Sequence, residues 1–427
     1  MNLRSAIFWF KDTFLGNQLI RKNLESVKKY TDEGVDNYDQ LNVIVKWVKQ
    51  EVPFYKQYRD MEFSQFPIVN KKIIREQFDN FRANFFLNES LHSESTSGST
   101  GTPFTIYQDD EKRLRAAADS LFFSEMADFK LGTKLYYVRV WNKMNKKTFF
   151  QCKMKNIVMQ DSSLLTDSNI EKFLRRLESD KSEKSILVYA NTLTALYRWM
   201  CSTGRKSNAK IASIITMSES LPLEVKNGMQ EIFNCPVVSR YSNQECGLIS
   251  QQRFDGDEYV INTGSFFVEI LKLDSDGIAE EGELGRIIVT DLYNKAMPMI
   301  RYDTGDLGVM TYVTKNGKKG KFLAKIEGRS NDFLFSTKGE LLSPVTISVN
   351  MWKFIELKQY QFIQTGKTNF KIKIVCDSNP YTRESELIAD IKNLVGKEAN
   401  IDLIYEENIP LLKSGKRKYV INEMQKN

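Results

Sequence analysis

The sequence has few of the residues on which many hydrolases and metalloenzymes depend. It contains a single histidine, His92, so a Ser-His or Cys-His catalytic pair would have to use that residue, and a metal site with several histidine ligands is excluded. The five cysteines include no C-x-x-C pair, and an odd number in a long chain is typical of free thiols in a reducing compartment. Most hydrolase mechanisms and a zinc site are therefore disfavoured.

Long apolar runs are missing as well. No run reaches the ~18 residues needed to cross a bilayer, and the amino terminus lacks a cleavable signal pattern, which predicts a cytoplasmic protein. Apolar residues at 7–10, 14 and 15 lie among Arg4, Lys11 and Arg21 in the pattern of an amphipathic helix. We expect this helix to pack on its own domain, with peripheral membrane contact as the alternative.

Charge of one sign is not concentrated anywhere along the chain. The formal net charge is +7, from 61 Lys and Arg against 54 Asp and Glu, and the basic residues form no block. This surplus suits anionic small molecules better than nucleic acid. With 41% hydrophobic residues and 9 prolines, the chain is typical of a globular protein, and 427 residues predict two or three cooperating units.

The hydrophobic pattern predicts an α/β fold. Helical spacing at 114–126, 191–200 and 223–233 alternates with short β-rich runs at 135–140, 186–189 and 211–215, which indicates a largely parallel sheet. Beyond about residue 260, strands at 266–271 and 286–290 with Gly-rich turns predict a small antiparallel sheet or barrel. A strand at 370–374, a helix at 387–395 and a strand at 401–405 predict a small α+β domain. We therefore predict a large domain at 1–328 and a small, mobile carboxy-terminal domain at 329–427.

The densest chemical signal is a Ser/Thr/Gly run, Ser95-Thr96-Ser97-Gly98-Ser99-Thr100-Gly101-Thr102-Pro103, which we expect to lead directly into the predicted helix at 114–126. Free backbone at the glycines and many hydroxyl groups suit a cradle for phosphate oxygens. The spacing differs from G-x-x-x-x-G-K-[ST], which excludes a P-loop NTPase motif. Taken alone, such a run is also typical of a flexible loop.

The run resembles the first signature of the adenylate-forming superfamily, Thr-Ser-Gly-Ser/Thr-Thr-Gly-x-Pro. Four further segments resemble later motifs of that superfamily in the same order. They are Tyr-Ser-Asn-Gln-Glu at 241–245, Ile-Arg-Tyr-Asp-Thr-Gly-Asp at 300–306, Gly-Arg-Ser-Asn-Asp at 328–332 and Pro-Leu-Leu-Lys-Ser-Gly-Lys at 410–416. Within the superfamily, the chain is most similar to the branch of phenylacetate-coenzyme A ligase and the CapK-type capsular polysaccharide proteins. The signals are Phe66-Pro67-Ile68-Val69 followed by Lys71, a histidine just ahead of the loop, and Gly282 to Arg286.

The resemblance implies that a substrate carboxylate attacks the α-phosphate of ATP, giving an acyl adenylate and pyrophosphate, and that a thiol then takes the acyl group. It implies ATP, Mg²⁺ and coenzyme A as cofactors, and a small carboxylic acid and a thiol acceptor as partners. Because charge develops on the phosphoryl group, fixed donors and cations matter more than a base, which is compatible with one histidine.

The resemblance also implies residue roles. Lys416 would place positive charge at the reacting carboxylate and α-phosphate, Glu245 would ligate Mg²⁺, and Asn331 with Asp332 would form the hinge of the small domain. The predicted nucleotide-binding residues are Thr96, Ser97, Gly98, Ser99, Thr100 and Gly101 at the pyrophosphate, Tyr241 with Ser242 and Asn243 at adenine, and Asp306 with Arg329 at ribose.

Three positions depart from the superfamily pattern. Phe104 stands where many acyl ligases have a lysine after the loop proline, Ser242 replaces a glycine, and Asn331 replaces the first aspartate of the hinge. The last change leaves open whether the second half-reaction is intact.

The acid pocket is weakly encoded. His92, Tyr137 and Arg139 are candidates to line it, with Tyr136 and Trp141 nearby, although a row of aromatic residues is equally well explained by packing.

The sequence thus predicts an acid-thiol ligase, with acyl decoration of a surface polysaccharide as its context. Two alternatives stay open at this point: an amide ligase that passes the acyl group to an amino sugar or amino acid, and a non-catalytic nucleotide-binding regulatory protein.

Overall fold

The computed structural model describes residues 2–96, 104–141, 145–163, 165–315, 318–329, 333–354, 356–410, 412 and 418–424. By its internal contacts the chain divides into two compact units. Unit 1 comprises residues up to 134, 153–156 and 238–326, and unit 2 comprises 135–152, 157–237 and 327–427. Both units mix helices and strands, which confirms the predicted α/β class. The domain boundary near residue 328 stays a prediction.

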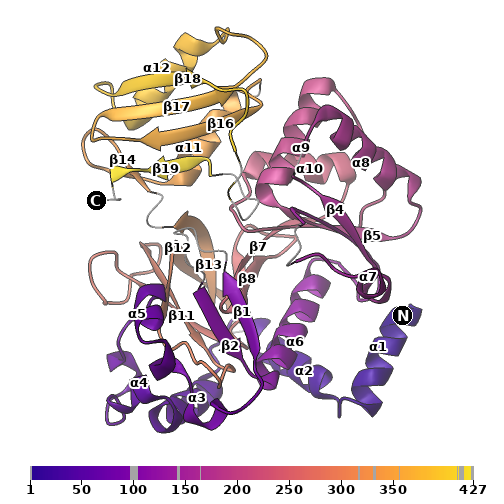
Figure 1. Cartoon of the computed structure of the whole chain (residues 1–427), viewed down its shortest axis with the longest axis vertical. Coiled ribbons are helices and arrows are strands. Elements are labelled where there is room, and N and C mark those ends of the chain that lie inside the picture. The colour runs from indigo at the N-terminus through magenta and orange to yellow at the C-terminus, as the bar shows by residue number, and fades with distance from the viewer. Residues whose placement is uncertain are drawn as a thin grey trace. The chain divides into compact units, whose positions relative to one another are not determined.

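In unit 1, α2 packs against α6, a helix that the sequence predicted from residue 114. The helix begins earlier, at Asp110, because Asp109 caps it by accepting a hydrogen bond from the Lys112 backbone N–H at 2.9 Å. Its buried Ala118 and Phe122 pack against Leu24 of α2. Figure 1 shows α2 and α6 side by side. The helices are α1 (Leu3–Phe14), α2 (Leu19–Thr31), α3 (Tyr38–Glu51), α4 (Pro53–Lys56), α5 (Lys71–Glu76) and α6 (Asp110–Met126).

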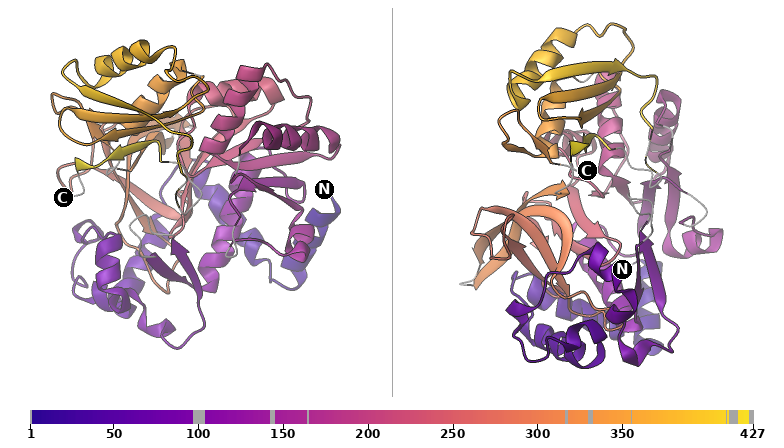
Figure 2. Two further views of the ribbon diagram at one scale, coloured as in Figure 1. Left: turned by 45° about the horizontal axis from the view of Figure 1, so that its top comes forward. Right: turned by 60° about the vertical axis from the view of Figure 1, so that its left-hand side comes forward.

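Unit 1 also contains a curved run of strands in the order β10-β11-β12-β13-β9-β8-β7. The pairs β10–β11, β11–β12, β13–β9, β8–β9 and β7–β8 are antiparallel. The first of these pairs confirms the antiparallel sheet predicted from the strands at 266–271 and 286–290. Figure 2 shows the strong curvature of the salmon and orange strands. The strands are β7 (Val237–Asn243), β8 (Gly247–Gln252), β9 (Tyr259–Ile261), β10 (Phe266–Leu271), β11 (Leu284–Asp291), β12 (Tyr302–Lys315) and β13 (Lys318–Arg329).

The Ser/Thr/Gly loop connects two paired strands. β1 (His92–Thr96) runs antiparallel to β2 (Phe104–Gln108), and Thr96 lies opposite Phe104 where the loop begins and ends. The expectation that the loop leads directly into a helix is therefore wrong, because β2 intervenes before α6. Burial alternates along β2, with Phe104 and Ile106 inside, as period-two packing requires.

A buried ion pair and a buried arginine connect α6 to the ends of the sheet strands. Lys112 lies 2.7 Å from Asp291, and both side chains are buried. Arg115, also fully buried, donates to the Gly264 carbonyl at 2.6 Å and to the Ser265 hydroxyl at 2.7 Å. Since a buried charge is tolerated only when it is paired, these contacts fix where β10 begins and β11 ends.

Unit 2 contains the parallel strand pairs β3–β4 and β5–β6 within the order β6-β5-β3-β4, which confirms the parallel arrangement. α10 covers the predicted residues 223–233, whereas β6 begins at Ile214 and not at the predicted residue 211. The elements are β3 (Lys134–Arg139), α7 (Phe149–Lys155), β4 (Ile157–Asp161), α8 (Asp167–Ser179), β5 (Lys184–Tyr189), α9 (Ala190–Thr203), β6 (Ile214–Met217) and α10 (Leu223–Phe233).

The carboxy-terminal part of unit 2 has its own hydrophobic core. A sheet with order β18-β17-β16-β19 carries Phe362 and Ile372 on one face, where they pack with Leu387 and Ile391 of α12. The predicted α+β arrangement of this region is confirmed. Its elements are β14 (Leu334–Phe335), β15 (Leu341–Leu342), α11 (Pro344–Asn350), β16 (Gln359–Gln364), β17 (Asn369–Val375), α12 (Glu384–Val395), β18 (Asn400–Tyr405) and β19 (Val420–Asn422).

The amino-terminal helix corrects one expectation. α1 forms as predicted, but Leu3, Ile7, Phe10 and Phe14 are exposed, so most of its apolar residues do not pack on their own domain. None of the helices in the described part of the chain has both the length and the apolar character that spanning a membrane requires.

Candidate functional site

Two of the sequence motifs meet in unit 1, although some sixty residues separate them in the chain. The Tyr302 hydroxyl donates a hydrogen bond to Glu245 Oε1 at 2.7 Å, and the Tyr241 hydroxyl donates to Asp306 Oδ2 at 2.7 Å. The first motif covers the end of β7 and the turn after it, and the second begins β12. These two strands are not neighbours in the sheet order, so the two hydrogen bonds connect separate parts of the sheet.

Glu245 is the charged centre of this junction. Its side chain is 2% exposed, and its Oε1 lies 2.8 Å from the ammonium nitrogen of Lys71 as well as accepting from Tyr302. A carboxylate buried to this degree keeps its charge only with a cationic or hydrogen-bonding partner. The two contacts supply both kinds of partner.

Lys71 reaches Glu245 because the chain before it is hydrogen-bonded to β12. The Val69 N–H donates to the Arg301 carbonyl at 3.1 Å, and the Asp303 N–H donates to the Val69 carbonyl at 2.8 Å. α5 then begins at Lys71, and the Asn70 side chain accepts from the backbone N–H groups of Lys72 and Ile73, both at 3.0 Å. The lysine therefore starts a capped helix at a fixed place.

The same ammonium group lies over the ring of Phe104, 5.8 Å from its centroid. Phe104 is the first residue of β2, directly after the Ser/Thr/Gly loop. The Lys71 ammonium group therefore lies beside Phe104, the position at which many acyl ligases have a lysine. The sequence offered Lys71 only as part of a resemblance, without a role, because a contact between positions 71 and 104 leaves no mark in local spacing.

Asp306 lies in β12, at an irregular stretch where the register with β11 shifts. Gly305 has a φ of +78°, which favours glycine, and its N–H donates to Asp303 Oδ1 at 2.8 Å. The Asp306 N–H donates to the Thr304 hydroxyl at 3.2 Å, and Tyr241 holds the carboxylate itself. The Thr-Gly-Asp sequence therefore suits the backbone conformation at this point, in addition to any chemical role of Asp306.

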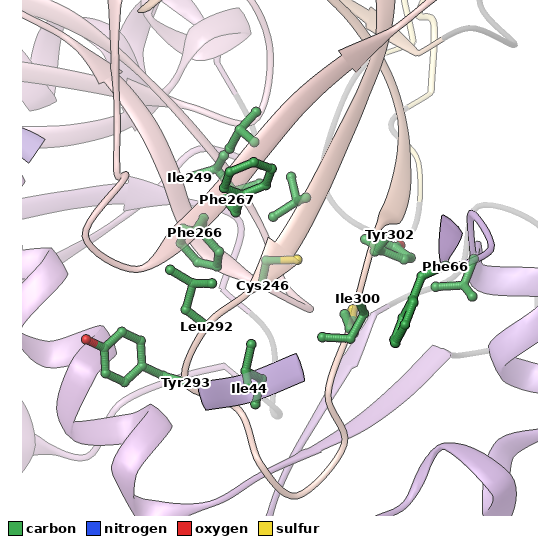
Figure 3. Close-up of a cluster of buried hydrophobic side chains, with 14 of the residues drawn as sticks. Ile44, Phe66, Cys246, Ile249, Phe266, Phe267, Leu292, Tyr293, Ile300 and Tyr302 are labelled. Atoms are coloured by element: carbon green, nitrogen blue, oxygen red, sulfur yellow. The ribbon is translucent and has the colours of Figure 1, made fainter. Parts of the chain in front are cut away.

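Arg301 of the same motif is structural. Its guanidinium lies 3.1 and 3.2 Å from the two oxygens of Glu269, and it donates to the carbonyls of Ser64 and Phe66 at 2.7 and 3.1 Å. The side chain is buried, and its backbone φ is +48°, an uncommon value outside glycine. These contacts hold the segment before Tyr302 against the wall of the hydrophobic cluster in Figure 3, where Phe66 and Tyr302 are labelled.

The weak acid-pocket candidates fall in different units. His92 begins β1 in unit 1 and lies 2.8 Å from Glu94, which also accepts a hydrogen bond from Gln244 in the Tyr-Ser-Asn-Gln-Glu motif. In unit 2, the Arg139 guanidinium donates to the Tyr137 hydroxyl at 3.1 Å. It also lies within 6 Å of the ring centres of Tyr137, Trp141 and Tyr189. Tyr136 is buried in the core, so packing explains it. A pocket that uses all three candidates stays a prediction.

Comparisons with known proteins agree with these motifs. Residues 334–423 match the family model described as the CapK C-terminal domain. Protein CapK of Staphylococcus aureus is 24% identical over 377 residues, which cover 85% of this chain and 80% of that protein. Phenylacetate-coenzyme A ligase of Aromatoleum evansii is 28% identical over 183 residues, 40% of this chain and 41% of that protein.

A solved structure shows the same fold over nearly the whole chain. 2-Hydroxyisobutyryl-CoA ligase, in its postadenylation state with an acyl-AMP bound, superimposes with a TM-score of 0.69 at 15% identity, covering 91% of this chain and 89% of that one. These similarities support the adenylate-forming superfamily and, within it, the branch of phenylacetate-coenzyme A ligase and CapK. The resemblance seen in the sequence is thereby confirmed.

Within this superfamily framework, the structure places part of the predicted nucleotide site. Tyr241, Ser242 and Asn243 end β7, and the Asn243 side chain accepts from the Cys246 N–H at 2.7 Å, which shapes the turn around Glu245. Thr96 ends β1 and Arg329 ends β13. The roles of these residues at a nucleotide stay predictions. Outside the described residues lie Ser97, Gly98, Ser99, Thr100, Gly101, Asn331, Asp332 and Lys416.

A magnesium ion would have Glu245 as its protein ligand. A carboxylate oxygen is the hard donor that Mg²⁺ prefers, and one carboxylate with phosphate oxygens is a usual ligand set. The described residues contain no cluster of three or more metal-binding side chains, so the phosphates would have to supply the remaining ligands. The residues present fit such an ion, although Lys71 and Tyr302 already contact one carboxylate oxygen.

The two bridging tyrosines remain protonated at neutral pH. Burial, followed by the charge of Asp306, raises the pKa of Tyr241 well above 10, and burial followed by the charge of Glu245 does the same for the pKa of Tyr302. Both hydroxyls therefore stay hydrogen-bond donors to their carboxylates.

These shifts predict a loss of stability at alkaline pH. Above pH 10 the unfolded chain releases the phenolic protons while the folded chain keeps them, so the free energy of unfolding falls, by about 1.4 kcal/mol per pH unit for each such tyrosine. Urea unfolding between about pH 8 and pH 11 measures the slope. We expect Tyr241→Phe and Tyr302→Phe each to make it shallower. A phenolate absorbance near pH 10 from either residue in the folded chain would contradict this account.

Proposed function

We propose that this protein is a ligase that activates a small carboxylic acid with ATP, releases pyrophosphate and transfers the acyl group to a thiol, with coenzyme A as the acceptor. The observation that carries the proposal is the junction of Glu245 with Tyr302 and of Tyr241 with Asp306, which unites two superfamily motifs in one place. The likeness to phenylacetate-coenzyme A ligase and to 2-hydroxyisobutyryl-CoA ligase supports the reaction type.

In the first half-reaction a carboxylate oxygen of the acid bonds to the α-phosphorus of ATP, and the bond to pyrophosphate breaks. Both reactants are anions, so catalysis depends on positive charge and fixed donors at the phosphoryl group. Lys416 is proposed to supply that charge to the acid and the α-phosphate. The backbone from Thr96 to Gly101 is proposed to hold the departing pyrophosphate.

Asp306 is proposed to accept hydrogen bonds from the ribose hydroxyls, with Arg329 beside the same sugar and Tyr241 against adenine. The Tyr241 hydroxyl fixes Asp306 Oδ2 at 2.7 Å, so the carboxylate does not rotate away from the sugar. Glu245 would hold a Mg²⁺ ion, which would neutralise phosphate charge. Lys71 holds that carboxylate in place and adds a cation beside the loop.

In the second half-reaction the thiol sulfur bonds to the acyl carbon and AMP leaves. We propose that Asn331 and Asp332 form the hinge on which the small domain turns between the two steps. The similarity to CapK extends the proposal to acyl decoration of a surface polysaccharide.

Exchange of labelled pyrophosphate into ATP tests the adenylation step. The intact protein with Mg²⁺ should catalyse exchange only when the right acid is present, across a panel of aryl, hydroxy, fatty and amino acids. Adding coenzyme A should then give a thioester that mass spectrometry identifies. Exchange followed by acyl transfer to an amine, and not to coenzyme A, would favour an amide ligase. Nucleotide binding without exchange on any acid would favour a regulatory protein.

Lys416→Ala tests the predicted catalytic lysine. Loss of one preorganised donor at the reacting phosphoryl group costs about 2.7 to 4 kcal/mol, so the exchange rate should fall by a factor of about 100 to 1,000 while ATP affinity is nearly kept. Lys413→Ala is the matched control, since it removes an equal charge three residues away in the same basic segment. Equal losses in the two variants would show that only general charge matters.

Lys71→Met tests the cation beside the loop. The variant leaves the Glu245 carboxylate without its ammonium partner, so we expect slower exchange by at least about tenfold. We also expect a lower requirement for Mg²⁺, because no ammonium group then competes for the same carboxylate oxygen. Lys72→Met removes an exposed lysine from the same turn of α5 and should change neither quantity. Circular dichroism of both variants confirms that they are folded before rates are compared. An unchanged rate and Mg²⁺ requirement in Lys71→Met would refute this role.

A further inference from the structure

The helix α1 has its large apolar side chains on the outside. Leu3 is 77% exposed, Phe10 is 61% exposed and Phe14 is 69% exposed, and Ile7 between them is exposed as well. These four residues follow one another at steps of four, three and four, which places them on one face of a helix. Leu15, directly after the helix, extends this apolar face and is also exposed.

The opposite face of α1 holds small and polar groups against the protein. Ser5 and Asp12 are buried, and Asp12 accepts hydrogen bonds from the backbone N–H groups of Ile20 and Arg21 at 3.0 and 3.1 Å. Trp9 is partly buried and packs on the core between α2 and α6. These contacts fix the helix in an orientation that leaves its apolar face in solvent. A helix that packs inside a domain would bury that face instead.

The exposed charge around this face is of one sign. Between residues 2 and 22 the exposed charged side chains are Arg4, Lys11, Arg21 and Lys22, and Asp12, the acidic residue in that range, is buried. A neighbouring helix end adds to the same pattern. Asn2 donates to the Leu131 carbonyl at 2.9 Å and Asn156 donates to the Gly132 carbonyl at 3.1 Å, so the end of α7 lies beside the start of α1.

That end of α7 carries an exposed Met154 between the exposed lysines Lys153 and Lys155. α1 itself is the indigo helix at the edge of its unit in Figure 1. Apolar side chains flanked by cations are thus gathered here from two segments that lie far apart in the sequence.

We propose that the apolar face of α1 binds the surface of an anionic lipid bilayer, with Leu3, Ile7, Phe10 and Phe14 among the acyl chains and the basic residues at the headgroups. An outward apolar stripe bordered by Lys and Arg is the pattern of a helix that lies in the plane of a membrane interface. A second copy of the chain fits less well, because a symmetric contact through this face would oppose Arg4 and Lys11 to the same cations. The proposal is independent of the proposed catalysis.

Co-sedimentation of the full chain with vesicles tests the proposal. Vesicles of phosphatidylglycerol and phosphatidylcholine should bind the protein, vesicles of phosphatidylcholine alone should bind it at least about tenfold less, and binding should weaken with added salt. Phe10→Glu/Phe14→Glu should lower binding to the anionic vesicles at least about tenfold, because it places charge among the acyl chains. Phe254→Glu, at an exposed aromatic residue outside α1, is the matched control and should bind as the unchanged chain does.

Three outcomes would overturn the proposal: no binding of the unchanged chain to anionic vesicles, equal binding by the Phe10→Glu/Phe14→Glu variant, or a dimer in solution that this variant alone converts to a monomer. The substituted side chains are exposed, so thermal unfolding should show the same transition in the variant. Pyrophosphate exchange by the variant, measured without vesicles, separates membrane binding from catalysis, since it should equal that of the unchanged chain.

Discussion

The buried carboxylate of Glu245 is the constraint on which the candidate site depends. A charge that is 2% exposed must be paired, and its partners come from positions 71 and 302, so three distant parts of the chain have to meet for the unit to fold. The backbone hydrogen bonds between Val69 and β12 hold two of these parts together before any side chain is considered. The same contacts therefore assemble the candidate site and hold the segment before α5 against the curved sheet.

A second set of buried charges fixes the frame around that site. Two buried contacts connect α6 to the ends of sheet strands: Lys112 pairs with Asp291, and Arg115 donates to Ser265. Arg301 with Glu269 then locks the first residue of the Arg-Tyr-Asp-Thr-Gly-Asp segment in an unusual backbone conformation. A buried charge that loses its partner destabilises the fold strongly, so these side chains have to keep their positions. A carboxylate such as Asp306 is thereby presented from a rigid element, as binding of a small polar ligand requires.

Much of the local structure followed from the sequence. α10 occupies the predicted range, and β10 does too, because period and composition act over a few residues. The start of α6 was missed, since its first turn is polar and only the Asp109 cap marks it. The strand β2 was missed because the run before it suggested a loop leading into a helix. The ion pair of Lys71 with Glu245 could not be predicted from the sequence, because no local pattern encodes a pairing across 174 positions.

The sequence by itself determined the α/β class, the superfamily and the order of its motifs, because these depend on residue types at short spacing. Only the tertiary structure decided that Tyr241 holds Asp306, that Lys71 stands beside Phe104, and that Arg301 is structural. The tertiary structure also decided that the apolar residues of α1 face solvent. Periodicity shows that a helix has an apolar face but does not show whether that face points toward the protein or away from it. The physical reason is the same in each case: side-chain partners are chosen by the folded sheet and its buried charges, which act between residues that the chain keeps far apart.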